Sequence, residues 1–279
     1  MTINTEIKVL DHGFVRLIDS MGSDLSIVRS ARVSYDADWR AGENEGSDFR
    51  LVNYLWKNKH TSPFESVTFT FEVKAPIFVF RQWHRHRTWS YNEVSARYSQ
   101  LPEEFYLPDP RLIGKQSESN KQMRDVNDIS EEDLTIRNDQ VEVLNQASKA
   151  CFKTYQELID AGWPRELARS ILPVSTYSHM FCSVNLLNLL KFITLRNHAH
   201  AQHEIQVYAD ALLTLIEPIV PITVGAWRKG IQETNISEKE KNLVSAFLHH
   251  CAATGQSFEE KPESMNKREW DGFKQKFDL

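Results

Sequence analysis

Hydrophobic and polar residues alternate most regularly from Val67 to Lys74, where apolar side chains occupy every second position. This two-residue period is typical of a β-strand with one buried face. A shorter alternation covers Phe14–Ile18, and Val174–Val184 is rich in residues that favour strands. The sequence therefore predicts three strands that lie far apart along the chain.

Between and after these segments, apolar residues recur at every third or fourth position, which is the period of an amphipathic helix. Most of the predicted helices begin with a residue that can cap a helix, or with a proline that fits its first turn. Their starts are Gly22-Ser23-Asp24, Ser47-Asp48, Pro76, Asn138, Pro164, Asn185 and a position shortly before Ile205. The helix after Asp48 is expected to end before Pro63, and the long helix from Asn138 to end at Gly162.

Three segments do not follow these periods. A loop is expected over Thr88–Ser99, and a polar surface insertion without apolar periodicity over residues 111–138. Near the C terminus, Ser237 and Glu240 form a capping box that predicts one more helix. The sequence thus predicts a main domain over residues 1–230 and a C-terminal helical extension over residues 231–279.

The segment Arg81–Ser99 is unusually basic for a chain of net charge −5, because it holds four arginines and one carboxylate, Glu93. Guanidinium groups present planar sets of N–H donors that match phosphate oxygens. Four aromatic residues are interleaved with the arginines: Trp83, Trp89, Tyr91 and Tyr98. A solvated basic face or an ion-pair network would explain the charge alone. The aromatic residues favour a planar phosphorylated ligand such as a nucleotide, or single-stranded nucleic acid.

The composition of the chain narrows these possibilities. Its net negative charge argues against general nucleic-acid binding, which needs a broadly basic domain. The three cysteines lie too far apart for a disulfide framework or a paired metal motif, so a reducing cytoplasm is expected. No apolar run has the length of a membrane span, and residues 1–10 lack a signal-peptide core. We expect a cytoplasmic protein with a small anionic ligand, and neither nucleic acid nor a membrane as a partner.

Other chemistries fit the sequence less well. His198, His200, His203 and Glu204 are candidate metal ligands, but they fall on a predicted amphipathic helix and no further residue completes a shell. The chain contains neither a G-x-G turn nor a phosphate-binding P-loop, so a bound dinucleotide would have to be held by side chains. No cysteine has a basic neighbour that would favour a thiolate nucleophile.

Arg85-His86-Arg87, seven further residues and Ser95 match the R-H-R-x7-S signature of the flavin-dependent thymidylate synthases. The neighbouring Gln82-Trp83, Ser90–Glu93 and Arg97–Ser99 also resemble that family, and the resemblance runs from about Asp11 to Trp227. It implies an α+β fold in which helices pack around a central, mostly antiparallel sheet.

The resemblance also implies a function. Members of the family make dTMP from dUMP by reductive methylation, with FAD as hydride carrier, methylenetetrahydrofolate as one-carbon donor and NADPH as reductant. They are homotetramers with shared active sites, in which the Glu93–Arg97 segment of one chain would face Gln82 and Arg169 of another. The rival hypothesis is a nucleotide- or RNA-binding module without catalysis, in which Glu93 and Arg196 would have no purpose.

The family match implies specific site residues. Arg196 is the catalytic candidate, because a cation near the uracil ring favours its electron-rich form. The implied dUMP contacts are Gln82, Trp83, His84, Arg85, Glu93, Val94, Ser95, Ala96, Arg97, Arg169 and Arg196. The implied FAD contacts are Ser34, Ser62, Glu65, Arg85, His86, Arg87, Glu93, Asn185, Leu187 and Lys191. Leu187 and Lys191 replace an arginine and an asparagine that are common in the family, and no metal is expected.

Overall fold

The computed structural model describes residues 4–117, 124–126, 129–198 and 200–232, together with residues 242, 244–246 and 248. It separates into one unit, Met1–Arg228, and a second unit, Lys229–Leu279. The first unit contains all the predicted site residues, and the description below concerns it. The helix predicted after Ser237 starts outside the described residues, so the C-terminal extension stays a prediction.

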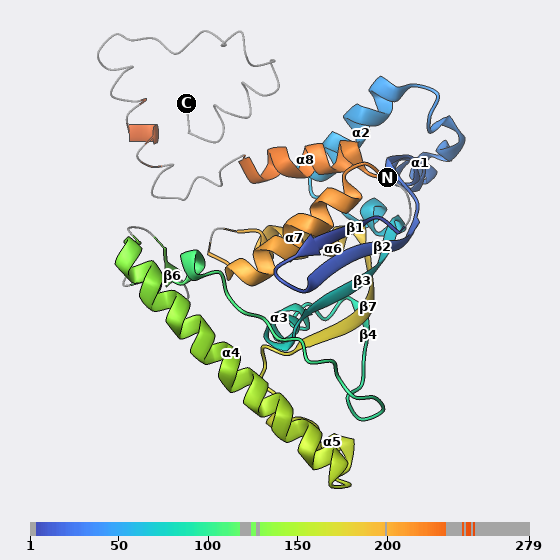
Figure 1. Cartoon of the computed structure of the whole chain (residues 1–279). Coiled ribbons are helices and arrows are strands. Elements are labelled where there is room, and N and C mark those ends of the chain that lie inside the picture. The colour runs from blue at the N-terminus through green and yellow to red at the C-terminus, as the bar shows by residue number, and fades with distance from the viewer. Residues whose placement is uncertain are drawn as a thin grey trace. The chain divides into compact units, whose positions relative to one another are not determined.

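Five antiparallel strands form the central sheet, in the spatial order β1-β2-β3-β7-β4 (Figure 1). Their bounds are Glu6–Val9 for β1, Gly13–Met21 for β2, Thr68–Pro76 for β3, Ser90–Glu93 for β4 and Tyr177–Asn185 for β7. The central pair, β3 and β7, is in register over nine residue pairs. The predicted α+β fold with a central antiparallel sheet is confirmed.

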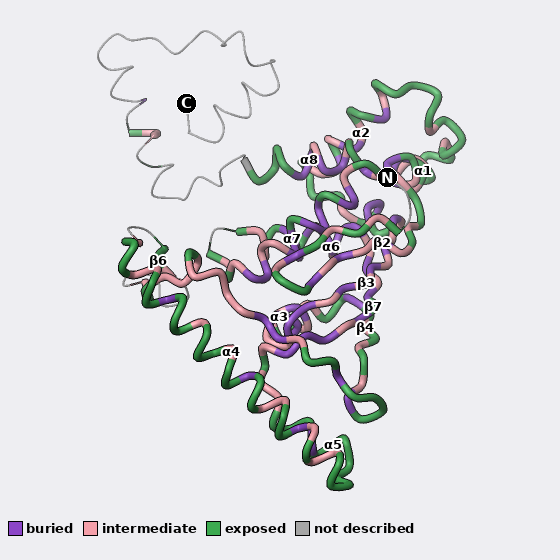
Figure 2. The backbone as a smooth tube through the Cα atoms, viewed as in Figure 1, coloured by how far each residue is buried: buried purple, intermediate pink, exposed green. Residues whose placement is uncertain are grey.

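One face of this sheet packs against the hydrophobic core. Alternate residues of the strands, such as Val15, Phe71 and Met180, are buried there (Figure 2). Helices α6 (Leu186–Arg196) and α7 (His203–Ile216) belong to the same core and are apolar over most of their length. Their burial is the main stabilising contribution of this unit, because apolar surface removed from water is worth about 25 cal/mol per Å².

A glycine allows α7 to approach the sheet closely. The Tyr208 hydroxyl of α7 donates a 2.8 Å hydrogen bond to the carbonyl of Lys74 on β3. A Cβ atom at Gly13 would lie 2.1 Å from that hydroxyl oxygen, so a larger residue would displace the tyrosine. The position therefore requires glycine for space, not for its backbone angles.

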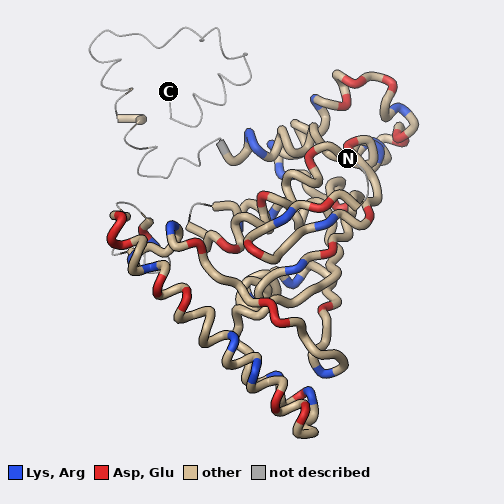
Figure 3. Tube along the Cα trace, in the orientation of Figure 1, with Lys and Arg blue, Asp and Glu red and all other residues tan. Residues whose placement is uncertain are grey.

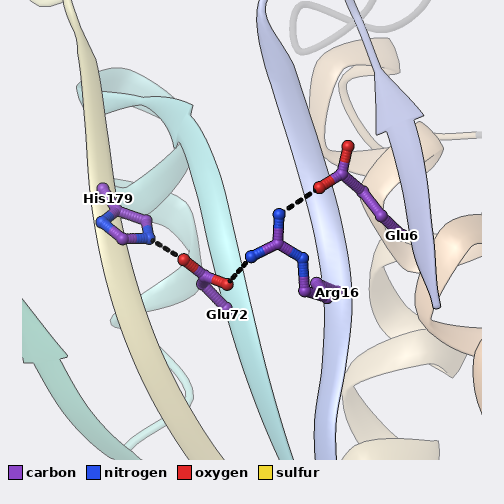
Figure 4. A network of polar contacts seen from close by, with 4 residues as sticks. All are labelled: Glu6, Arg16, Glu72 and His179. Carbon is purple, nitrogen blue, oxygen red and sulfur yellow. Dashed lines mark hydrogen bonds and ion pairs between the residues drawn. The ribbon is translucent and has the colours of Figure 1, made fainter. Parts of the chain in front are cut away.

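The opposite face of the sheet carries a polar ladder across four strands (Figure 4). Arg16 on β2 donates to Glu6 on β1 and to Glu72 on β3. The other oxygen of Glu72 lies 2.7 Å from Nε2 of His179 on β7. Because each charged group contacts a partner on the neighbouring strand, this face satisfies its charges without a covering helix.

Two helix starts differ from the prediction. Helix α2 (Glu45–Lys57) begins earlier than expected, because Asn44 caps it by accepting a 2.9 Å hydrogen bond from the Ser47 N–H. The predicted cap Asp48 instead pairs with Arg32, at 2.6 Å. Helix α4 (Glu131–Asp160) also begins before Asn138, because Ser130 and Asp133 form a capping box. The last residues of the predicted polar insertion are therefore helical.

The long helix α4 is mostly exposed and carries side chains of both signs (Figure 3). Its buried residues are Arg137, Ser148 and Tyr155. The described part of the preceding insertion contains the short hairpin of β5 (Lys115–Gln116) and β6 (Arg124–Asp125). These residues lie within the polar surface insertion expected over residues 111–138, which stays a prediction.

The other helices follow the predicted positions closely, except for α8. They are α1 (Asp24–Arg32), α3 (Ile77–Trp83), α5 (Arg165–Ala168) and the unpredicted α8 (Pro221–Gln232). The α8 start is fixed by Asp24, whose carboxylate accepts hydrogen bonds from the backbone of Ile222 and Thr223 and from the Thr223 hydroxyl. Pro221 is the first residue of this helix, a position that proline fits well. None of the helices in the described residues has the length and apolar composition needed to cross a membrane.

Strand β4 replaces part of the loop predicted over Thr88–Ser99. Ser90–Glu93 pairs with the free edge of β7, which aligns Glu93 with Met180. Tyr91 points to the core side, where its hydroxyl donates a 2.8 Å hydrogen bond to the His86 carbonyl. The polar residues of this segment thus form an edge strand, and this pairing sets the position of Glu93.

Candidate functional site

A cavity of about 640 Å³ opens beside the end of β4, and we call it the β4 cavity. Its walls come from α3, from the segment after β4, from α5 with the 3₁₀ helix η5 (Arg169–Ile171), and from β7. The polar lining residues are Arg81, His84, Glu93, Ser95, Glu166, Arg169, Ser170 and Ser178. Six residues implied as dUMP contacts therefore lie together here: His84, Glu93, Val94, Ser95, Ala96 and Arg169.

Contacts from two elements hold Glu93 in this cavity. The Ser178 hydroxyl of β7 donates a 2.5 Å hydrogen bond to Glu93 Oε1. The Nε2 atom of His84, one turn after Phe80 at the end of α3, lies 3.9 Å from the same carboxylate. Glu93 is therefore fixed by β7 on one side and by α3 on the other, which orients it for a ligand.

Arg169 and Glu166 line the same cavity, and Arg97, which does not line it, contacts Glu166. Arg97 forms a 3.5 Å ion pair with the Glu166 carboxylate, and Arg169 Nε donates to the Glu166 carbonyl at 3.4 Å. Both partners of the ion pair are about half exposed, so the pair itself contributes little stability. Arg169 has no ion pair with a carboxylate in the described part of the chain, which leaves its charge for an anionic ligand.

A second group of predicted residues gathers around Arg196, at the end of α6. Arg196 Nε donates a 3.0 Å hydrogen bond to His86 Nε2, and Nη2 donates at 3.1 Å to the carbonyl of Gln82. Because His86 Nε2 accepts a hydrogen bond, the imidazole is neutral with its proton on Nδ1. These two contacts fix the plane of the guanidinium group, and they leave Nη1 for a ligand.

Burial and charge shift the pKa values in this cluster. Burial, reinforced by the charge of Arg196, lowers the pKa of His86 to about 4. Burial and then the charge of Arg85 lower the pKa of Arg196. Among the described residues, none of Arg85, Arg87 and Arg196 has an ion pair with a carboxylate. A concentration of positive charge without a counter-ion is the arrangement expected of an anion site.

A second cavity, of about 750 Å³, adjoins this cluster, and we call it the α6 cavity. Leu187, Lys191 and Arg196 of α6 line it, together with Thr61 and Trp56. Leu187 and Lys191 are the two positions that depart from the family pattern. They lie one helical turn apart on α6, so the replacement of both family residues alters one wall of this cavity.

The remaining predicted FAD contacts lie around the same helix. Ser62 and Glu65 are exposed on the 3₁₀ helix η3 (Ser62–Ser66), which packs against α1 and α6. Asn185 caps α6 by accepting a 3.0 Å hydrogen bond from the Asn188 N–H, as predicted from the sequence. Ser34 is exposed on the turn after α1. None of these side chains lines the α6 cavity.

The four aromatic residues of the basic segment differ in how far they are buried. Trp83 is completely buried, its ring 4.7 Å from that of Phe192 between centroids, and Trp89 belongs to the same core cluster. Both indole rings thus pack in the core of this chain, and the contact of Trp83 with dUMP stays a prediction. Tyr98 is the most exposed of the four rings, at 78%.

The alternative chemistries find no support in the described residues. No group of three or more His, Cys, Asp or Glu side chains there is arranged to hold a metal ion. His198 and His200 line the α6 cavity, whereas Glu204 faces away into contacts with Tyr106 and Arg124. Cys182 is buried, which raises the pKa of its thiol and disfavours a thiolate.

The two cavities share no lining residue. Within one chain, Arg169 lines the same cavity as Glu93–Ala96, and the expectation that it faces that segment from another chain stays a prediction. Gln82, in contrast, lies with Arg196 outside the β4 cavity. Within one chain, the predicted site residues therefore form two separate groups. The first is Glu93–Arg97 with Arg169, and the second is Gln82, Arg85 and Arg196.

Four polar residues of the β4 cavity are absent from the sequence prediction: Arg81, Glu166, Ser170 and Ser178. Arg81 lies three residues before His84, so helical spacing was a usable signal for it. Ser178 has no such signal, because its contact with Glu93 depends on the pairing of β4 with β7.

A solved structure defines the class of protein to which this fold belongs. The UMP/dUMP methylase PolB from Streptomyces cacaoi, bound with 5-Br dUMP, is 36% identical and superposes with a TM-score of 0.71. The match covers 80% of this chain and 97% of that chain. The chain thus has the fold of a nucleotide methylase.

Residues 16–222 match the model of the thymidylate synthase complementing protein family. A protein of Rickettsia prowazekii named flavin-dependent thymidylate synthase is 41% identical over 95% of this chain and 91% of its own length. A protein of Treponema denticola with the same name is 40% identical over 98% of this chain and 97% of its own length. The chain belongs to the thymidylate synthase complementing protein family and is an enzyme, which confirms the resemblance drawn from the R-H-R-x7-S motif.

The depressed pKa of His86 predicts a pH dependence of stability. The unfolded chain takes up a proton on this residue near its ordinary pKa of 6.5, whereas the folded chain does so at about 4. The contribution of neutral His86 is therefore complete above the unfolded pKa and is lost as the pH falls toward the folded one. In urea unfolding, the free energy of unfolding should fall more steeply between about pH 7 and about pH 5 for the wild type than for His86→Gln. An equally steep fall in the variant would contradict the neutral state of His86.

Proposed function

We propose that this enzyme methylates dUMP to dTMP, with FAD as its flavin, methylenetetrahydrofolate as the one-carbon donor and NADPH as the reductant. The observation that carries the proposal is the cation cluster of Arg85, Arg87 and Arg196 without a carboxylate partner in the described residues. A nucleotide and a flavin dinucleotide both supply the anionic groups that such a cluster lacks. The relatives named flavin-dependent thymidylate synthase and the methylase bound with 5-Br dUMP support the same substrate and cofactor.

In this proposal, the β4 cavity provides the polar contacts for dUMP. Arg97 and Arg169 supply positive charge for the phosphate, and Ser95 supplies a hydroxyl at the same wall. Glu93, held by Ser178, offers a carboxylate for a donor group of the nucleotide. Ser95 acts as a contact and not as a nucleophile, because the described residues place no general base in hydrogen-bond contact with its hydroxyl.

Arg196 would activate the pyrimidine. Carbon C5 of uracil must become electron-rich before it can take a one-carbon unit, and negative charge then develops on the ring. A fixed guanidinium group stabilises that charge without covalent attachment of the ring. His86 and the Gln82 carbonyl hold the guanidinium plane in advance, so little reorganisation is needed when the charge develops.

The residues around Arg196 fit a flavin dinucleotide. Arg85, His86 and Arg87 supply donors for the pyrophosphate, and the α6 cavity supplies an apolar wall beside them. FAD supplies hydride chemistry when bound, while the residues of this chain bind and orient it. Leu187 offers no charge, so Lys191 is the cation that remains at this end of the cavity.

We further propose a homotetramer in which each active site combines two chains. What supports this is the separation of the two residue groups within one chain, because a catalytic Arg196 must reach the ring of a nucleotide held by Arg97 and Arg169. A second chain that brings its Arg196 cluster to the β4 cavity would complete the site.

The first prediction concerns the flavin. If Arg87 binds the FAD pyrophosphate through a charged hydrogen bond, Arg87→Ala should weaken FAD binding by about 1.5–3 kcal/mol. Flavin absorbance after gel filtration and titration of the apoprotein with FAD measure this loss. Arg111→Ala is a matched control, because Arg111 pairs with Asp109 on the exposed surface. Unchanged FAD binding in both Arg85→Ala and Arg87→Ala would overturn the assignment.

The second prediction separates activation from binding. Arg196→Lys keeps a positive charge but loses the planar group that His86 and Gln82 orient. We expect dTMP formation to fall by about 10²-fold or more, because one oriented charge contact is lost. NADPH should still reduce the bound flavin, which stopped-flow absorbance records. Near-normal dTMP formation in this variant would contradict the role of Arg196.

A further inference from the structure

Two successive tight turns lead from the end of α3 to β4, and they carry the arginines of the R-H-R motif. In the first turn, the His86 N–H donates a 2.9 Å hydrogen bond to the Trp83 carbonyl, which places Arg85 within that turn. In the second turn, the Trp89 N–H donates a long hydrogen bond, 3.4 Å, to the His86 carbonyl, which places Arg87 within that turn. Both arginine side chains are exposed, so the backbone of the turns sets the point from which each one starts.

A single hydroxyl group contacts the carbonyls that close both turns. The oxygen of the Tyr91 hydroxyl lies 2.8 Å from the His86 carbonyl oxygen and 3.2 Å from the Trp83 carbonyl oxygen. Burial raises the pKa of Tyr91, so the hydroxyl keeps its proton and acts as a donor. In the described part of the chain, the only other backbone donor to the His86 carbonyl is the distant Trp89 N–H. Tyr91 therefore supplies the principal hydrogen bond of that carbonyl.

This hydrogen bond fixes the plane of one peptide group. The peptide between His86 and Arg87 is planar, so the direction of its carbonyl sets a backbone angle on each side of it. Those two angles decide where the side chain of Arg87 leaves the chain relative to that of His86. A change in the direction of this carbonyl would therefore move the two outer donors of the motif relative to each other.

The sheet and the neighbouring rings hold Tyr91 in place. Strand β4 pairs Tyr91 with Cys182 of β7. The Tyr91 ring is stacked on that of Trp89, with centroids 6.2 Å apart, and meets the ring of His84 edge-on, at 4.7 Å between centroids. The donor is thus positioned before any ligand binds, and a strand positions a side chain more precisely than a loop does.

We propose that Tyr91 is a positioning residue for the flavin pyrophosphate, and that its hydroxyl fixes the two turns that present Arg85 and Arg87. The arginines contact the ligand, and Tyr91 acts through them. Without the hydroxyl, the turns adopt more than one conformation, and only the fraction with both arginines in place binds the cofactor. The inference rests on the proposed contact of FAD with Arg85 and Arg87.

The test is a titration of the full-length apoprotein with FAD, followed by flavin fluorescence. Tyr91→Phe keeps the ring and its packing and removes only the hydroxyl. We expect the Kd for FAD to rise by about three- to tenfold, because one ordinary hydrogen bond shifts the balance between the ordered turns and their alternatives by about that factor. At saturating FAD and dUMP, the kcat should stay within about twofold, because bound FAD selects the ordered turns.

Tyr208→Phe is the matched control. It also removes a buried hydroxyl that donates a 2.8 Å hydrogen bond to a main-chain carbonyl, in this case that of Lys74 on β3. Both variants should lose a comparable free energy of unfolding in urea, but the Kd for FAD should stay unchanged in Tyr208→Phe.

A rescue variant separates the lost donor from a general folding defect. Incorporation of para-aminophenylalanine in place of Tyr91 restores a donor at the same point of the ring, now as an N–H group. We expect this variant to bind FAD within about twofold of the wild type. A Kd as high as that of Tyr91→Phe would contradict the role of the donor.

The outcomes distinguish this inference from the proposed function. If Arg87→Ala weakens FAD binding but Tyr91→Phe does not, the positioning role is wrong and the cofactor assignment stands. An equal rise of the Kd in Tyr208→Phe would mean that the two hydroxyls act only through stability, which would also overturn the inference. If neither Arg85→Ala nor Arg87→Ala weakens FAD binding, the proposed pyrophosphate contact fails, and the inference fails with it.

Discussion

The site depends on how this chain holds one half-buried guanidinium group. Arg196 loses solvation at the end of α6 and lies near Arg85, and both effects lower its pKa. No carboxylate in the described residues neutralises it. The fold instead gives it two uncharged acceptors, a neutral imidazole and a main-chain carbonyl. These acceptors orient the cation without cancelling its charge, and the full charge remains for the ligand.

The central sheet explains why the other half of the site lies apart from Arg196. Pairing along β7 places Ser178 and β4 at the sheet edge, and this pairing puts Glu93 next to Ser178. The chain then turns into the segment that faces Arg169 across the β4 cavity. Helix α3 lies between the two halves: its Arg81 and His84 line the β4 cavity, while Gln82 contacts Arg196 and Gln202. One short helix therefore serves both groups of residues.

Local patterns predict much of this fold, and they fail where the outcome depends on distant partners. The alternation before Lys74 and the caps at Ser23 and Asn185 give β3, α1 and α6 correctly, because the signals are local. Strand β4 has little apolar character, and it forms because β7 offers a free edge.

The same distinction applies to the site. The R-H-R-x7-S motif gives the family and most candidate residues, but it does not distinguish Trp83 in the core from Tyr98 at the surface. Nor does sequence spacing reveal that Arg169 shares a cavity with Glu93 in one chain. That relation arises only from tertiary packing.

Mixed oligomers test the central claim most directly, which is that each active site combines the β4 cavity of one chain with the Arg196 cluster of another. Chains with Arg169→Ala and chains with Arg196→Ala, each nearly inactive and flavin-loaded alone, are unfolded and refolded together. Random assembly should restore about a quarter of the sites. A site is intact only when its β4 cavity comes from an Arg196→Ala chain and its Arg196 cluster comes from an Arg169→Ala chain. Arg97→Ala with Arg169→Ala is the control pair and should stay inactive, since both residues belong to the same half. Mixed oligomers verified by mass spectrometry that regain no dTMP formation, or a control pair that does, would contradict the account.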